Sequence, residues 1–151
     1  PDDTIFTELE YKFEILANRM RELAFLNKGI TISLVDQRTK NEEGKYVEAT
    51  FHSERGLPEF IEYVDANRDV ITKNVIHMDG EKNDIPVEVA MQYNTTYTEN
   101  IFSYVNNINT HEGGTHLSGF RRALTRTLKS YAEKSGMLAK EKITIAVRTL
   151  R

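Results

Sequence analysis

Apolar residues recur at helical spacing near the start of the chain. Intervals of four, three, four and three place five of them on one side of an α-helix: Leu9, Phe13, Leu16, Met20 and Leu23. Thr7 with Glu10 fits a capping box, and Gly29 fits a helix stop. The pattern predicts a core-facing helix from about Thr7 to Leu26.

Alternation of apolar and polar residues predicts strands in the next part of the chain. Ile30–Leu34 and Tyr46–His52 both alternate in this way. The charged and polar run Gln37–Gly44 between them indicates a loop and a candidate domain boundary. Leu57–Val64 follows as a short amphipathic helix with Pro58 in its first turn.

The second half of the chain continues with strands and one long helix. The predicted elements are strands at Val75–Met78, Ile85–Tyr93 and Ile101–Val105, a helix at Thr115–Lys134 and a strand at Lys142–Val147. Asp79–Gly80 is expected to begin a turn. This order predicts the α/β (α+β) class, with helices packed on a mixed sheet. The chain begins without methionine and ends within a strand, so we expect a segment of a longer protein.

The long helix has two chemically different sides. Gly113–Gly114 precedes it, and Thr115 is placed to cap its first turn. Its apolar side comprises Leu117, Phe120, Ala123, Leu124, Thr127, Leu128 and Tyr131. The opposite side comprises Arg122, Thr125, Arg126 and Lys129, with Arg121 at the boundary and Lys134 nearby. The basic side is either a solvated surface or a contact for nucleic-acid phosphates, which would be weak, salt-sensitive and independent of base sequence.

Composition narrows the function classes. The chain has 151 residues, 39% hydrophobic and 28% charged, and no cysteine, which excludes disulfides and thiolate metal sites and fits a cytoplasmic location. No apolar run is long enough to span a membrane. Its net charge of −3 means that any nucleic-acid binding must come from a local basic surface.

No catalytic centre can be proposed from the residue types. His111, Glu112 and His116 could suggest a metal site, but their spacing across a glycine pair favours a structural role for His116. The glycine pair could also cradle a phosphate, although neither phosphate-loop nor dinucleotide motif surrounds it. We therefore predict no catalytic, cofactor-binding or metal-binding residues.

Four segments, in order along the chain, resemble the DNA gyrase B family. Asn106–Arg121 reads NNINTHEGGTHLSGFR and is similar to the family's transducer segment. Arg19–Gly29 (RMRELAFLNKG) resembles the end of its ATPase module, and Val87–Asn94 with Tyr97–Asn100 resemble a transducer strand pair. The similarity extends from about Pro1 to Ala146. Leu117–Arg126 is closer to gyrase than to the related topoisomerase IV subunit, which remains an alternative.

The resemblance implies a division of the chain and a function for its parent protein. Residues 1–38 would end a GHKL-type ATPase module, and residues 39–151 would begin the transducer, whose βαβ fold is of the ribosomal-protein (S five domain two-like) type. The parent would be an ATP- and magnesium-dependent isomerase that negatively supercoils DNA, working with gyrase A and a second B subunit. The segment would couple nucleotide state to DNA capture.

The resemblance also assigns residues and shows departures from the family. Basic residues of the transducer helix line a DNA cavity in the family, which implies DNA contact by Arg121, Arg122 and Arg126. Lys129 is added as a DNA-binding candidate because helical spacing places it on the same basic side. The family's ATP-contacting motifs precede its equivalent of Pro1, and its Gln-Thr-Lys loop would follow Arg151, so we expect an inactive fragment without its own cofactor. Val147–Arg151 differs from the family's usual continuation. The rival hypothesis is a stand-alone, non-catalytic α/β module that binds protein or nucleic acid.

Overall fold

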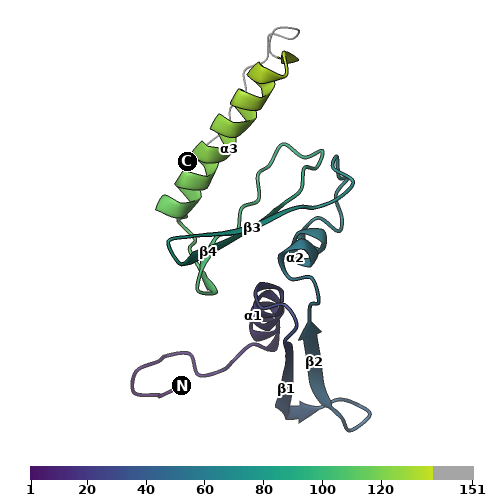
Figure 1. Cartoon of the computed structure of the whole chain (residues 1–151). Coiled ribbons are helices and arrows are strands. Elements are labelled where there is room, and N and C mark those ends of the chain that lie inside the picture. The colour runs from purple at the N-terminus through teal and green to yellow at the C-terminus, as the bar shows by residue number, and fades with distance from the viewer. Residues whose placement is uncertain (138–151) are drawn as a thin grey trace. The chain divides into compact units, whose positions relative to one another are not determined.

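The computed structural model describes residues 1–137 and divides the chain into two compact units, Pro1–Glu99 and a second that begins at Asn100. The first unit contains α1 (Phe13–Leu26), β1 (Thr31–Lys40), β2 (Tyr46–His52), α2 (Leu57–Val64), β3 (Ile76–Lys82) and β4 (Ile85–Met91). The second contains β5 (Tyr104–Val105), β6 (Ile108–Asn109) and α3 (Thr115–Lys134) (Figure 1).

The mixed α/β class is confirmed, and the described strands form three separate antiparallel pairs, β1–β2, β3–β4 and β5–β6. Each pair joins strands that follow one another in the chain, because a short turn brings them together at little entropic cost. The further strand predicted at Lys142–Val147 lies outside the described residues.

The core of the first unit lies between α1 and one side of the β1–β2 hairpin (Figure 1). Ala17, Ala24 and Phe51 form its buried centre. Around them pack partly buried apolar residues: Phe13, Met20, Ile32, Leu34 and Ala49. Ile32 pairs with Phe51, and Leu34 pairs with Ala49 across the hairpin, so alternate positions of both strands face the helix. The predicted helical stripe therefore contacts a strand pair, as an amphipathic helix should.

The start of α1 differs from the prediction. The helix begins at Phe13, and its N-cap residue Lys12 makes no side-chain capping bond, so the capping box at Thr7 and Glu10 is wrong. Leu9, the first member of the predicted stripe, is 45% exposed. Burying so little of Leu9 offsets only a small part of the conformational entropy that the chain would lose if the helix were extended to include it.

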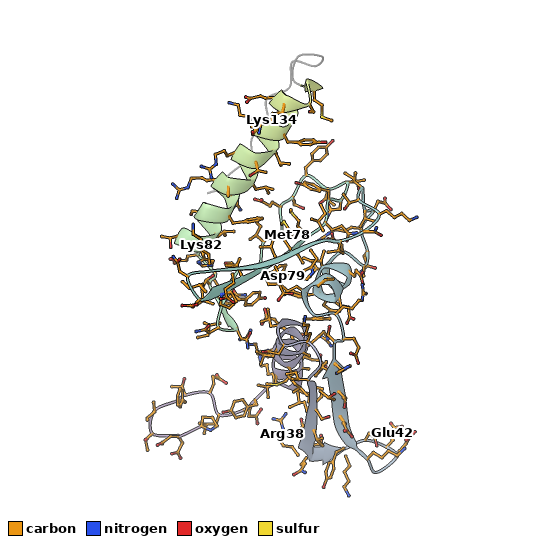
Figure 2. All side chains as sticks on the ribbon, in the orientation of Figure 1. Arg38, Glu42, Met78, Asp79, Lys82 and Lys134 are labelled. Carbon is orange, nitrogen blue, oxygen red and sulfur yellow. The ribbon has the colours of Figure 1, made fainter. Side chains whose placement is uncertain are left out.

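The β1–β2 hairpin is longer than predicted. β1 continues to Lys40, with an irregularity in pairing between Asp36 and Lys40, so the loop predicted at Gln37–Gly44 is reduced to its second half. Asn41 closes the turn, since its side-chain oxygen accepts the Glu43 and Lys45 amides. Figure 2 labels Arg38 and Glu42 at this end of the hairpin.

The β3–β4 hairpin turns later than predicted. β3 runs through Asp79 and Gly80, which pair with Glu88 and Val87, and a turn at Asp79–Gly80 is therefore wrong. The chain reverses at Asn83–Asp84, whose φ angles are +54° and +59°. Asn and Asp tolerate this left-handed conformation, and two such residues in succession suit a two-residue hairpin turn.

Candidate nucleic-acid interface

A short hairpin holds the chain just before α3. Its strands, β5 and β6, are joined at Asn106–Asn107, whose φ angles are +50° and +65°. Ser103 and Thr110 close the hairpin: the Thr110 amide donates to the Ser103 carbonyl at 2.8 Å, and their hydroxyls lie 2.6 Å apart. The strand predicted at Ile101–Val105 is thus shortened to two residues, and its partner was not predicted.

The His116 side chain, in the first turn of α3, contacts this hairpin. Its Nε2 lies 3.3 Å from the Thr110 hydroxyl, which confirms a structural role for His116. Within residues 1–137 no group of three or more His, Cys, Asp or Glu side chains could hold a metal ion.

The glycine pair shapes the turn into the helix. Gly113 and Gly114 have φ angles of +76° and +148°, which other residues rarely adopt. Gly114 is the N-cap and Thr115 is already helical, so the predicted cap at Thr115 is wrong. The left-handed backbone favours glycine at position 113, and a β-carbon there would also crowd Leu117, whose Cδ2 would lie 3.0 Å away.

Two glycines in this region are expected to respond oppositely to alanine substitution. Gly119 lies within α3, and no described atom is within 4 Å of the position of an added β-carbon, so Gly119→Ala should raise the free energy of unfolding by about 0.5–1 kcal/mol. Gly113→Ala should lower it by more than about 1 kcal/mol, because the backbone is left-handed and Leu117 is close. Urea denaturation followed by circular dichroism measures both, and shifts in the same direction would contradict this account.

The half-buried side of α3 is displaced around the helix from the predicted apolar side. Leu117, Phe120, Leu124 and Leu128 are half-buried, and Ala132 is buried. Three residues assigned to the apolar side are exposed: Ala123, Thr127 and Tyr131. Thr125, assigned to the basic side, is half-buried, and its hydroxyl donates to the Arg121 carbonyl at 2.8 Å.

The basic residues of α3 fall into two groups. Arg122, Arg126 and Lys129 are exposed on one side of the helix, which we call the basic side, and no ion pair within residues 1–137 neutralises them. Arg122 Nε donates to the Ser118 carbonyl at 3.3 Å, so its stem lies along the helix. Arg121 is half-buried and takes part in an interaction of its own, which separates it from the other three.

The spacing and charge of the basic side suit a polyanion. Seven residues of helix place Arg122 and Lys129 about 10 Å apart along the axis. One strand of duplex DNA carries about three phosphates over that length. Glu133 is the one acidic residue of α3, and Lys134 adds a basic residue at its end (Figure 2). The helix therefore has a local excess of positive charge in a chain whose net charge is −3.

A buried polar cluster at the junction of β2 and α2 was missed from the sequence. Ser53 is 1% exposed, and its hydroxyl donates to Glu59 Oε2 at 2.7 Å and accepts the Gly56 amide at 2.9 Å. The hydrogen bond from Ser53, aided by the Arg55 amide and guanidinium, lowers the pKa of Glu59. The sequence did contain a signal for this cluster: a serine shortly before the predicted helix and a glutamate in the first turn of that helix.

Solved structures define the fold of the chain. It is similar to the 43K ATPase domain of Thermus thermophilus gyrase B, solved in complex with an aminocoumarin, with a TM-score of 0.74 and 29% identity over 91% of this chain and 36% of that one. It is also similar to the B subunit of the DNA gyrase from Myxococcus xanthus, with a TM-score of 0.76 and 26% identity over 90% and 36%. The chain thus has the α/β fold of part of a gyrase B protein.

Sequence comparison establishes the family. The sequence model described as DNA gyrase B matches residues 56–151. Gyrase B of Cytophaga aurantiaca is 63% identical over 145 residues, which cover 96% of this chain and 30% of the relative, and gyrase B of Streptococcus pneumoniae is 50% identical over 139 residues, covering 91% and 21%. The chain belongs to the DNA gyrase B family. It spans less than a third of the length of these two relatives, and their names do not favour the topoisomerase IV alternative.

The helices of residues 1–137 include none that is long and apolar enough to cross a membrane.

Proposed function

We propose that this chain is the part of a gyrase B subunit that couples nucleotide state to DNA capture. The observation that carries the proposal is the 63% identity to a gyrase B over 96% of the chain. The parent protein would be an ATP-dependent DNA topoisomerase that introduces negative supercoils in the cytoplasm. It would use ATP and magnesium and act with gyrase A and a second B subunit.

We also propose the division of the chain at residues 38 and 39. The segment before the division would end the ATPase module, and the segment after it would begin the transducer. The family model matches residues 56–151, which supports placing α2 and the described elements after it in the second segment. The division falls within β1, whose partner β2 packs with it against α1, so the two segments would share one core at this point.

The DNA contact of this segment would lie on the basic side of α3. Arg122, Arg126 and Lys129 are exposed and without an ion pair in the described part of the chain, which supports contact with backbone phosphates. Arg121 is assigned to the same role by resemblance, and its half-buried position would give it a smaller share of the contact. Such binding would be weak and reversible, as the capture of a DNA segment for passage requires.

A chimera tests this function. The aligned 145-residue segment of this chain would replace its counterpart in Cytophaga aurantiaca gyrase B, and the chimera would be combined with gyrase A of that organism. We expect supercoiling of relaxed plasmid only when ATP and magnesium are present, and no ATP hydrolysis by the 151-residue chain alone. A folded chimera without supercoiling, or ATP hydrolysis by the isolated chain, would refute the proposal.

A further inference from the structure

The junction between β2 and α2 is held by a closed set of hydrogen bonds. We call Ser53, Arg55, Gly56 and Glu59 the junction cluster. Glu59 receives the Ser53 hydroxyl on one carboxylate oxygen and the Arg55 amide, at 3.0 Å, on the other. The Ser53 hydroxyl accepts the Gly56 amide, so both the strand end and the helix start are bonded to the same two side chains. The bonds restrict a connection that contains a glycine and would otherwise be free to bend.

The junction cluster is also attached to the end of α1. The Ser53 carbonyl accepts the amide of Gly29, just beyond α1, at 2.7 Å. Gly56 has a φ angle of +70°, and a β-carbon there would lie 3.2 Å from both the Lys28 β-carbon and the Phe25 carbonyl oxygen. The backbone therefore approaches α1 as closely as a glycine permits.

Aromatic packing extends the same connection along α2. The rings of Phe25 on α1 and Phe60 on α2 are stacked with centroids 5.4 Å apart, and Tyr63 lies 5.7 Å from Phe25. Within the junction cluster Ser53 is 1% exposed and its hydroxyl is hydrogen-bonded, whereas the side chains of Glu59 and Arg55 are 25% and 58% exposed. The serine end of the cluster is therefore the part that is shielded from water. Helices α1 and α2 thus meet through both apolar and polar contacts.

The far end of α2 is bonded to the chain that follows β4. Asp65, which is 8% exposed, pairs with Arg68 at 2.7 Å and accepts the side-chain amide of Asn94 at 3.2 Å. The Thr95 amide donates to the Asp69 carbonyl at 2.9 Å. A displacement of α1 would therefore reach the segment beyond β4 through α2, provided that the junction between β2 and α2 does not bend.

We propose that the junction cluster is a positioning device that makes α1 and α2 move as one body. The proposal rests on the coupling function proposed above, because α1 belongs to the segment assigned to the ATPase module and α2 to the transducer. Glu59 is its central positioning residue, since it receives both Ser53 and Arg55. Loss of the cluster would leave each helix folded but would let the angle between them vary.

Hydrogen exchange in the 151-residue chain tests the local part of the proposal. Ser53→Ala removes the hydroxyl, and Glu59→Gln keeps the side-chain size while removing the charge and one acceptor. In both variants the amides of Arg55 and Gly56 should exchange at least ten-fold faster, with α3 unchanged. Glu42→Gln is the matched control, because it makes the same chemical change at an exposed residue in the turn of the β1–β2 hairpin, outside the junction cluster. Unchanged exchange in Glu59→Gln would overturn the proposal.

Coupling in the gyrase chimera tests the functional part. Glu59→Gln should raise the number of ATP molecules hydrolysed per supercoil at least threefold while the ATPase rate stays within twofold. Glu42→Gln, in the turn of the β1–β2 hairpin, should leave the ratio unchanged. An unchanged ratio, or a parallel loss of both activities, would overturn the positioning role. If the unsubstituted chimera does not supercoil DNA, the proposed function fails instead, and hydrogen exchange still decides whether the cluster holds the junction.

Discussion

Replacing Arg122 and Arg126 together by alanine is expected to weaken the binding of duplex DNA by up to about 60-fold at 0.1 M monovalent salt. Each phosphate contact contributes about 0.9 to the slope of log affinity against log salt concentration, because a bound counterion is released. Losing two contacts should therefore reduce the slope by about 1.8. Both side chains are exposed and carry no ion pair in the described chain, so they require little desolvation before contact.

Fluorescence anisotropy with a random-sequence duplex of about 30 base pairs, titrated between 50 and 200 mM salt, would measure this effect. The matched control is Lys73→Ala with Lys82→Ala, which removes the same charge from exposed positions of the first unit. An equal loss in both double variants would mean that net charge alone governs binding. Tight binding to one base sequence, insensitive to the substitutions, would favour the rival hypothesis of a stand-alone module.

Replacing Phe51 by alanine is expected to lower the free energy of unfolding by about 3–5 kcal/mol. Phe51 is a buried member of the core between α1 and the hairpin, and the Arg21 guanidinium lies 5.0 Å from its ring centroid. The substitution removes apolar surface and leaves a cavity that the surrounding helix and strands fill only in part. Since small domains are stable by about 5–15 kcal/mol, the loss would be a large part of the total.

Urea denaturation of the 151-residue chain would measure this loss. Tyr97→Ala is the control, because Tyr97 is fully exposed and its removal should change the free energy by less than about 0.5 kcal/mol. Phe51→Leu should fall between the two, since it restores part of the lost volume. A change below about 1 kcal/mol in Phe51→Ala would show that the α1–hairpin core does not stabilise the first unit.

Three elements were predicted with their observed bounds, because both their residue spacing and their start or stop residues could be identified in the sequence. β2, α2 and α3 begin and end where alternation, helical spacing, Pro58 and Gly136 indicate. Each of these signals acts within a few residues, so the local sequence is enough to predict where these three elements begin and end. The early start assigned to α1 was wrong: Leu9 continues the spacing but is 45% exposed, and spacing does not show whether a partner surface exists.

The candidate interface was also predicted only in part, because helical spacing shows which residues share a side but not how far each is buried. Helical periodicity brought Arg122, Arg126 and Lys129 to one side, and the structure confirms that all three are exposed. Periodicity placed Arg121 at the boundary between the two sides, and the structure shows it half-buried. Spacing along a helix places such a residue between the two sides and does not determine how far its side chain is buried.

The sequence by itself determined the family, the class of fold, the central helices and strands, and the basic side of α3, because these follow from motifs and from spacing along the chain. The tertiary structure decided where α1 begins, how far β1 and β3 extend, and which residues of α3 are half-buried. It also brought Ser53 and Glu59 together beside Gly29. The core around α1 and the junction beside Gly29 depend on contacts between separate elements, and the ends of β1 and β3 depend on pairing across each hairpin. The spacing of residues along one segment does not contain the energies of these contacts.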